Sequence, residues 1–154
     1  MTTLAIDAMG GDHGLATTIP ASLKALQEFP KLHLLLVGDE VSIAQKLASL
    51  PHDASRISIV HAEQVVDMDE SPSKALRGKR KSSMRQAIDA VHEGRAGAAV
   101  SAGNTGALMA MAKFVLKTLP GIERPAICTM LPRIGGHTMM LDLGANVGCS
   151  GENL

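Results

Sequence analysis

The sequence has few aromatic residues and no excess of charge of either sign. Of its 154 residues only two are Phe, and Trp and Tyr are absent. The core must therefore be aliphatic, and the chain lacks the aromatic rings on which single-strand nucleic-acid binders stack bases. The formal net charge is zero, so the basic footprint of a nucleic-acid-binding protein is also missing. We expect no nucleic-acid partner.

Cysteines and long apolar runs are also scarce. Two cysteines cannot build a disulfide framework, and neither belongs to a Cys-x-x-Cys pair. The first residues carry no basic segment and reach an acid at Asp7, so we expect no signal peptide. No apolar run approaches the length that spans a bilayer. These features favour a reducing, cytoplasmic setting.

Short apolar runs alternate with segments of helical periodicity. Strands are predicted over Leu4–Ile6, Leu32–Val37, Ile57–Val60, Ala98–Ser101, Ala126–Leu131 and Thr138–Leu143. Helices are predicted from a cap at Thr18 with Pro20 in the first turn, over Val41–Leu50, from Ser82 or Ser83 to Gly94, and over Ala107–Leu116. The stretch from His61 to Gly78 shows no regular pattern. The link Pro132–His137 is too short for a crossover helix, so the last two strands should be antiparallel.

This alternation predicts one α/β unit over residues 1–154, with a mostly parallel sheet and helices on both faces. The helix over Ala107–Leu116 is apolar on nearly every side except at Lys113, so protein must cover most of its surface. No closing element follows the last predicted strand. We therefore expect part of a longer protein.

Three glycine-rich turns each follow a predicted strand, at Asp7–Asp12, Ser101–Gly106 and Asp142–Gly148. Ligands of open α/β sheets bind beyond the carboxyl ends of the strands, so these turns should converge along one edge. In the second turn, glycines let the backbone approach a ligand, and the next helix offers free N–H groups to an anion. Its hydroxyl and amide side chains add neutral donors. A plain strand-to-helix turn with a capping Asn explains the pattern equally well.

The other two turns carry carboxylates. Asp7 and Asp12 flank Gly10 and Gly11 and could orient a donor, act as a base or bind a metal. Ordinary turn chemistry is the favoured interpretation there, and carboxylate spacing alone defines no metal ligands, so no metal site is predicted. The last turn combines Asp142, Gly144 and Asn146 in the same style, and turn chemistry is again slightly favoured.

A basic run interrupts this neutral chain. It comprises Lys74, Arg77, Lys79, Arg80, Lys81 and Arg85. Such a run could collect phosphate or the acidic surface of a carrier protein, although charge runs are more often solvated faces. Ser82 and Ser83 follow it at the start of a predicted helix, which favours anion binding. By contrast, no Ser/His/Asp or Cys/His arrangement and no G-x-S-x-G motif is present. If an acyl group is transferred, the attacking group should not be a protein side chain.

Five blocks in order resemble the phosphate acyltransferase family of bacterial phospholipid synthesis. They are Asp7–Asp12, Ser82–Arg85, Ser101–Met109, Gly121–Ala126 and Leu141–Val147. The third block is the most specific. The resemblance implies an isocitrate/isopropylmalate-dehydrogenase-like fold, similar to that of phosphotransacetylases, of which this chain forms the N-terminal portion.

The resemblance also implies an activity and partners. The enzyme would make acyl phosphate from fatty acyl carrier protein and inorganic phosphate, without a cofactor. Its product would pass to a membrane glycerol-3-phosphate acyltransferase, and the enzyme would be a homodimer associated peripherally with the inner membrane. We take Asp7, Asn104 and Asp142 as candidate catalytic residues. Candidate phosphate- and substrate-binding residues are Gly10, Gly11, Asp12, Lys79, Arg80, Lys81, Ser82, Ser83, Ser101, Gly103, Thr105, Gly106, Gly144 and Asn146.

Three alternatives stay open. One is a short-chain phosphotransacetylase that uses coenzyme A. Another is an isocitrate-type dehydrogenase, which would need a cluster of metal-binding aspartates that this part of the sequence does not offer. The third is a non-catalytic adaptor for acyl carrier protein or membrane, in which the polar turns would be dispensable.

Overall fold

The computed structural model describes residues 2–122 and 125–141, and the chain divides into two compact units, residues 1–116 and 117–154. In the first unit, four parallel strands form one sheet in the order β3-β2-β1-β4. The strands are β1 (Thr2–Asp7), β2 (Leu32–Gly38), β3 (Ile57–His61) and β4 (Ala98–Ser101). The helices are α1 (Leu15–Glu28), α2 (Glu40–Ala48), α3 (Pro72–Gly78), α4 (Ser83–His92) and α5 (Thr105–Leu116), with a 3₁₀ turn η1 (Ala54–Arg56).

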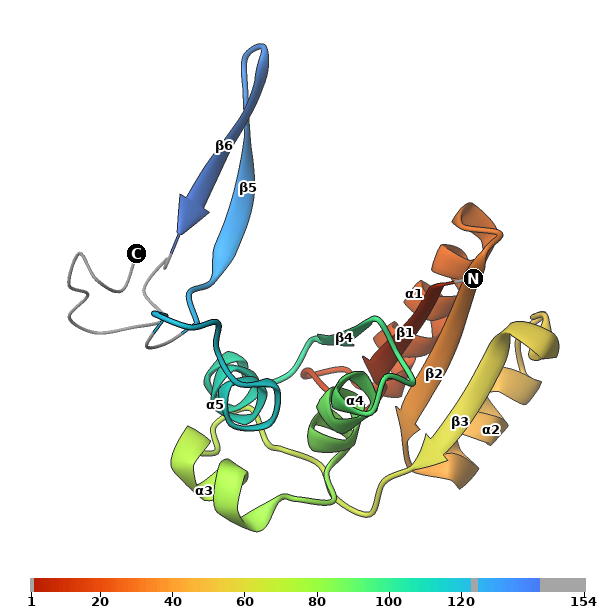
Figure 1. Ribbon diagram of the computed structural model, residues 1–154. Helices are drawn as coiled ribbons and strands as arrows, with labels where there is room; N and C mark the ends of the chain where they lie inside the picture. The colour runs from red at the N-terminus through yellow and green to blue at the C-terminus, as the bar shows by residue number, and fades with distance from the viewer. Residues whose placement is uncertain (1, 123–124, 142–154) are drawn as a thin grey trace. The chain divides into compact units, whose positions relative to one another are not determined.

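Helices cover both faces of this sheet, as predicted (Figure 1). The central strand β2 shows why, since its side chains alternate between two aliphatic cores. Leu34 and Leu36 pack with α1 and α2 on one face, whereas Leu35 and Val37 face α4 on the other. A strand buried on both faces needs apolar residues at nearly every position, which explains its continuous apolar run.

A third cluster joins α3, α4 and α5. Met84 of α4 and Met111 of α5 are fully buried there with Ala75 of α3. The predicted cover for the apolar helix thus comes partly from these two neighbouring helices. Phe114 and Leu116 of α5 are nevertheless 53% and 42% exposed.

The first helix begins earlier than predicted. It starts at Leu15 after Gly14, so Thr18 is not its cap and Pro20 lies inside the helix instead of in its first turn. The Thr18 hydroxyl donates to the carbonyl of Ala8 at 2.7 Å and so ties α1 to the turn after β1. The prediction mistook a polar side chain that anchors the helix for one that begins it.

Helix α3 was missed, because the stretch up to Gly78 was expected to be irregular. Pro72 occupies its first turn, and the Ser71 hydroxyl before it accepts from the Lys74 N–H. Ser followed by Pro is a helix-start signal. Seven residues are too few, however, to display apolar periodicity.

The second unit contains an antiparallel hairpin of β5 (Cys128–Arg133) and β6 (Gly136–Leu141), as the short link predicted. Its turn is tighter than expected. Pro132 and His137 pair within the strands, which leaves Ile134 and Gly135 at the turn. Gly135 has φ 77°, a left-handed conformation that glycine adopts without strain. The apolar sequence around Cys128 predicts a buried thiol, and this prediction is wrong, since the thiol is exposed.

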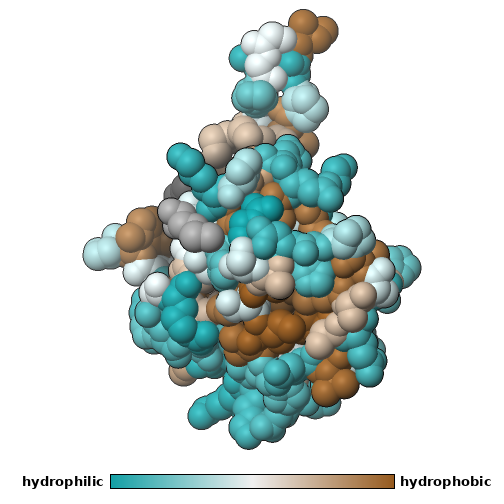
Figure 2. Space-filling model, turned by 90° about the vertical axis from the view of Figure 1, so that its right-hand side faces the viewer, coloured by the Kyte–Doolittle hydropathy of each residue, from teal (hydrophilic) through white to brown (hydrophobic). Residues whose placement is uncertain are grey.

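The first unit carries apolar surface. Figure 2 shows hydrophobic atoms gathered over the middle of one face, with hydrophilic side chains around them. Patches of this kind are typical of faces that another segment or chain covers. Within residues 2–122 and 125–141, no helix has the length and hydropathy needed to cross a bilayer.

The cap of α2 generates a prediction on pH and stability. Hydrogen bonds from the Ser42 hydroxyl and backbone N–H hold the pKa of Asp39 below its ordinary value. A lowered pKa stabilises the fold above the unfolded-state pKa, and this contribution is lost as the pH falls through the folded-state pKa. Asp39→Ala should therefore lower the unfolding free energy near neutral pH, and the difference from the parent should shrink in acid. Urea titrations across pH measure this, and Asp39→Asn, which keeps an acceptor, should lose less.

Candidate functional site

The strand order reverses between β1 and β4, and the polar turns meet at this point. The chain leaves β1 for α1 on one face and leaves β4 for α5, which packs with α4 on the other face. Open α/β sheets bind ligands in the crevice where the strand order reverses. Of the three turns expected to converge, Asp7–Asp12 and Ser101–Gly106 do so. The third lies outside the described residues, together with Asp142, Gly144 and Asn146.

A hydrogen-bond chain joins the two turns. Asp7 and Ser101 are register partners at the ends of β1 and β4. The Ser101 hydroxyl donates to Asp7 Oδ2 at 2.7 Å and accepts from the Gly103 N–H at 3.0 Å. Asp7 is 2% exposed, and its Oδ1 has no hydrogen-bond partner among the described residues. The only hydroxyl proton of Ser101 is therefore used inside the protein, and the second carboxyl oxygen of Asp7 is buried beside it.

Glycines make this contact sterically feasible. A Cβ atom on Gly10 would lie 2.6 Å from Asp7 Oδ2 and 3.0 Å from the Gly103 nitrogen. A Cβ on Gly103 would lie 3.0 Å from the Cε atom of Met84 in α4. Gly11 has φ 88° and lies close to the Ala102 carbonyl. The glycines that were expected to approach a ligand thus first permit the two turns to approach each other.

Asn104 fastens a third segment to this site. Its Nδ2 group donates to the carbonyls of Asp67, Met68 and Glu70 at 2.8–3.2 Å. Its Oδ1 accepts from the Ala107 N–H at 3.0 Å, which is the geometry of a helix cap. The polar atoms of Asn104 are therefore engaged in holding the turn at residues 67–70 against α5.

The first N–H groups of α5 are the open donors of the site. Neither the Thr105 nor the Gly106 N–H has an acceptor among the described residues. Thr105 is exposed, and so is Asp12 in the turn after β1. Free N–H groups at a helix start, together with the helix dipole, favour an anion. Gly106 also lies against α3, since a Cβ there would meet the Pro72 ring at 2.8 Å.

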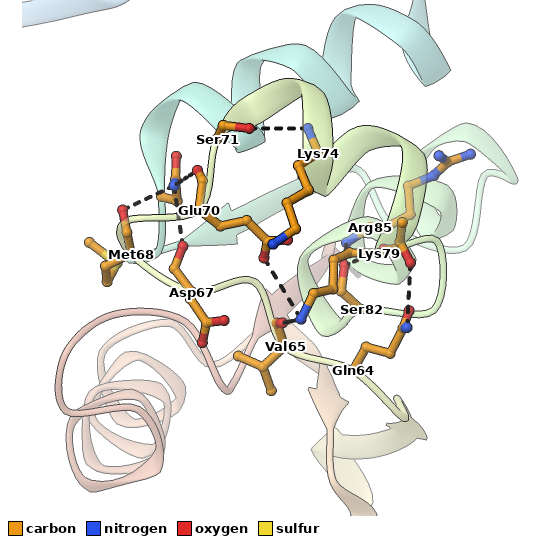
Figure 3. Close-up of polar contacts among 12 residues, drawn as sticks. Gln64, Val65, Asp67, Met68, Glu70, Ser71, Lys74, Lys79, Ser82 and Arg85 are labelled. Atoms are coloured by element: carbon orange, nitrogen blue, oxygen red, sulfur yellow. Dashed lines mark hydrogen bonds and ion pairs between the residues drawn. The ribbon is translucent and has the colours of Figure 1, made fainter.

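The basic run does not converge on these donors. The Lys79 ammonium donates to the Val65 carbonyl at 2.9 Å and lies 3.7 Å from Glu70 Oε2 (Figure 3). Lys81 pairs with Glu63 at 3.0 Å. Acidic residues of the preceding segment thus engage two of the three predicted phosphate-binding cations. Arg80 is exposed and makes no ion pair within the described part of the chain.

The two serines after the basic run differ in role. Ser82 is fully buried, accepts from the Arg85 N–H and donates to the Lys79 carbonyl, so it caps α4 as predicted. Ser83 is 1% exposed, and its hydroxyl has no hydrogen-bond partner among the described residues. The start of α4 reaches the Ser101–Gly106 turn through Met84.

Sequence reasoning missed the segment that supports the site. Glu63 and Glu70 neutralise lysines, and the carbonyls of residues 67–70 bind Asn104. The order of the charges, acidic residues first and basic residues next, was the available signal for internal pairing. Within residues 2–122 and 125–141, no group of three or more His, Cys, Asp or Glu residues could hold a metal.

Solved structures share this fold. A phosphotransacetylase from Streptococcus pyogenes matches with a TM-score of 0.61 at 14% sequence identity, over 90% of this chain and 45% of that one. The EutD phosphotransacetylase from Staphylococcus aureus matches with a TM-score of 0.56 at 17% identity, over 90% and 44%. The chain therefore has a phosphotransacetylase-like α/β fold, and it spans less than half the length of those proteins.

Sequence comparison is more specific. A phosphate acyltransferase from Hydrogenovibrio crunogenus is 60% identical over 98% of this chain and 45% of the relative. Its namesake from Halorhodospira halophila is 58% identical over 99% and 45%. The chain thus spans less than half the length of the curated relatives it matches. The model of the fatty acid synthesis protein family matches residues 2–154, and the chain belongs to this family.

The glycine contact yields a test. Gly10→Ala places a methyl group against the Asp7 carboxylate and the Gly103 nitrogen, so the two turns must separate. We expect a loss of about 1–3 kcal/mol in unfolding free energy, the usual cost of overpacking. The matched control is Gly78→Ala, whose Cβ would meet no atom within 4 Å. Denaturant titration compares the two, and equal stabilities would contradict the close packing of the turns.

The hydrogen bonds of Asn104 can be tested by substitution. Asn104→Asp keeps an acceptor for the Ala107 N–H but replaces the donor that binds the carbonyls of residues 67–70. Hydrogen exchange should become faster in residues 67–71, while the first turn of α5 stays protected. Leaving the carbonyls unsatisfied should cost about 1–3 kcal/mol. Asn104→Ala should speed hydrogen exchange both in residues 67–71 and in the first turn of α5. Unchanged exchange at residues 67–71 in either variant would disprove the contact.

Proposed function

We propose that the full-length protein is a phosphate acyltransferase, which transfers a fatty acyl group from acyl carrier protein to inorganic phosphate. The observation that carries the proposal is 57–60% identity over nearly the whole chain to curated relatives of that name. The geometry supports it, because an anion-binding helix start lies at the reversal of the strand order.

The reaction needs no protein nucleophile. An oxygen of hydrogen phosphate attacks the thioester carbonyl carbon, the C–S bond breaks, and the phosphate proton passes to the leaving thiolate. The products are acyl phosphate and the free thiol of the carrier. A thiol with a pKa of about 8.5 is a good leaving group. The protein must align phosphate with the carbonyl and stabilise the oxyanion.

Different residues of the described site would bind phosphate and position the groups around it. The Thr105 and Gly106 N–H groups, with the Thr105 hydroxyl, bind phosphate or the oxyanion at the start of α5. For the proposed catalytic role of Asp7, its unpartnered Oδ1 would have to become accessible to the phosphate proton when substrate binds, because this atom is buried. Asn104 acts by positioning, because its amide hydrogens already bind the turn at residues 67–70. The catalytic role of Asp142 and the substrate-binding roles of Gly144 and Asn146 stay proposals that rest on the sequence alone.

Further proposals concern the whole protein. Acyl phosphate is a reactive mixed anhydride, so its transfer to a membrane glycerol-3-phosphate acyltransferase fits an enzyme that works at the cytoplasmic side of the inner membrane. Peripheral association and a homodimer are proposed with it. The exposed apolar surface of the first unit supports coverage by further protein or lipid.

A second candidate is a phosphotransacetylase that uses short-chain acyl coenzyme A, which the likeness of fold favours. The experiment compares both donors on the full-length protein. Loss of long-chain acyl carrier protein that requires phosphate, with acyl phosphate trapped by hydroxylamine, supports the acyltransferase. Turnover of acetyl coenzyme A alone supports the second candidate. Binding of the carrier without consumption would leave a non-catalytic adaptor and defeat both enzyme hypotheses.

The Asp7–Ser101 contact gives a kinetic prediction. Ser101→Ala removes the hydroxyl that links Asp7 Oδ2 to the Gly103 N–H. Because misplaced groups can cost about 10²-fold in rate, kcat should fall to that extent while KM for the acyl donor changes little. Ser49→Ala removes one exposed hydroxyl at the end of α2 and serves as the control. Equal kcat values for the two variants would exclude the positioning role.

A further inference from the structure

The cations of the chain are concentrated in one segment. Six of the 15 Lys and Arg residues lie between Lys74 and Arg85, and no Asp or Glu occurs from Ser71 to Ile88. A chain of zero net charge thus has a local basic surface on α3 and the turn after it. Such segregation favours an anionic partner.

Three of these cations stabilise the protein itself. Lys79 binds Glu70 and the Val65 carbonyl, and Lys81 pairs with Glu63. Arg85 pairs with Asp89 and lies 5.7 Å from the centre of the Phe114 ring. These side chains hold the segment together and are not available to phosphate.

The other three are exposed and make no ion pair within the described residues. Lys74 and Arg77 are three positions apart and so lie on one side of α3, where they line a shallow hollow of about 440 Å³ with Ser73 and Gly78. Arg80 comes next in the turn, also exposed. We call Lys74, Arg77 and Arg80 the α3 basic patch. Lys74 also lines a second hollow, which it shares with Lys79 and with the acidic residues Asp67, Asp69 and Glu70.

Helix α3 is held directly beside the candidate site. Its Ala75 is fully buried against α4 and α5, and Pro72 contacts Gly106 at the start of α5. Asn104 binds the carbonyl of Glu70 just before the helix. A partner on the outer side of α3 is therefore one helix away from the donors of α5.

We propose that the α3 basic patch docks the acidic surface of the carrier protein that delivers the acyl thioester. This proposal rests on the proposed function. The exposed position of the patch, around a shallow hollow on the outer side of α3, suits a protein surface better than a small phosphate ion, which the N–H groups at the start of α5 serve. No large apolar side chain between Ser71 and Gly97 is exposed, so the patch offers no anchor for a bilayer. Electrostatic docking of this kind sets encounter rate and orientation.

The test uses the full-length protein and two acyl donors. Lys74→Glu/Arg77→Glu should raise KM for acyl carrier protein about tenfold at low salt and leave kcat unchanged. Turnover of the same acyl group on pantetheine, which has no protein surface, should be unaffected. The KM difference should shrink as salt screens the charges. Lys24→Glu/Lys31→Glu has the same change in charge on exposed lysines outside the patch and should behave as the parent.

Three outcomes would overturn the docking surface. These are an unchanged KM for the carrier, an equal loss with the pantetheine thioester, and loss of binding to anionic vesicles without any change in KM. The last would assign the patch to a membrane. Failure of the proposed function appears differently, because the parent would then consume neither thioester. Titration with unacylated carrier still measures docking in that case, and equal affinity for parent and Lys74→Glu/Arg77→Glu would refute it.

Discussion

The hydrogen bond from Ser101 to Asp7 is the interaction on which the architecture of the site depends. A carboxylate that is 2% exposed must be satisfied by nearby donors, because burial without them is costly. The donor comes from the neighbouring strand, and glycines must replace larger residues wherever the two turns touch. One buried carboxyl group and its hydrogen bond therefore constrain both the spacing of the turns and their composition.

This contact also changes how the Ser101–Gly106 turn is understood. Its most polar side chains face inward: Ser101 donates to Asp7, and Asn104 binds the turn at residues 67–70. The groups that remain open are the backbone N–H groups at the start of α5 and the exposed Thr105 hydroxyl. These donors lie at the start of α5, which is supported by α3, α4 and the turn at residues 67–70, so they have little freedom to rearrange. Fixed donors are the condition for electrostatic stabilisation of a transition state.

Periodicity and burial made part of this fold predictable from the sequence. The strand Leu32–Gly38 and the turn after Ala98–Ser101 were recognisable, because a doubly covered strand is continuously apolar and parallel strands end at one edge. Helix α3 was not, since its seven residues are held by tertiary contacts with α5 and not by their own pattern. The ion pairs of Lys79 and Lys81 were also not predicted, because a run of basic residues does not reveal which carboxylates will pair with it.

Neutral donors and cations are therefore separated in this protein, and the separation has a physical reason. In the proposed reaction, cations beside the N–H groups of α5 would bind phosphate in its ground state, and uniform binding of that kind lowers KM without raising kcat. Backbone N–H groups are weaker ground-state ligands, yet they are fixed in direction. Charge at the α3 basic patch instead acts over a longer range on a diffusing partner. In this proposal, the donors at the sheet edge align the phosphate, and the α3 basic patch beside them attracts the carrier protein.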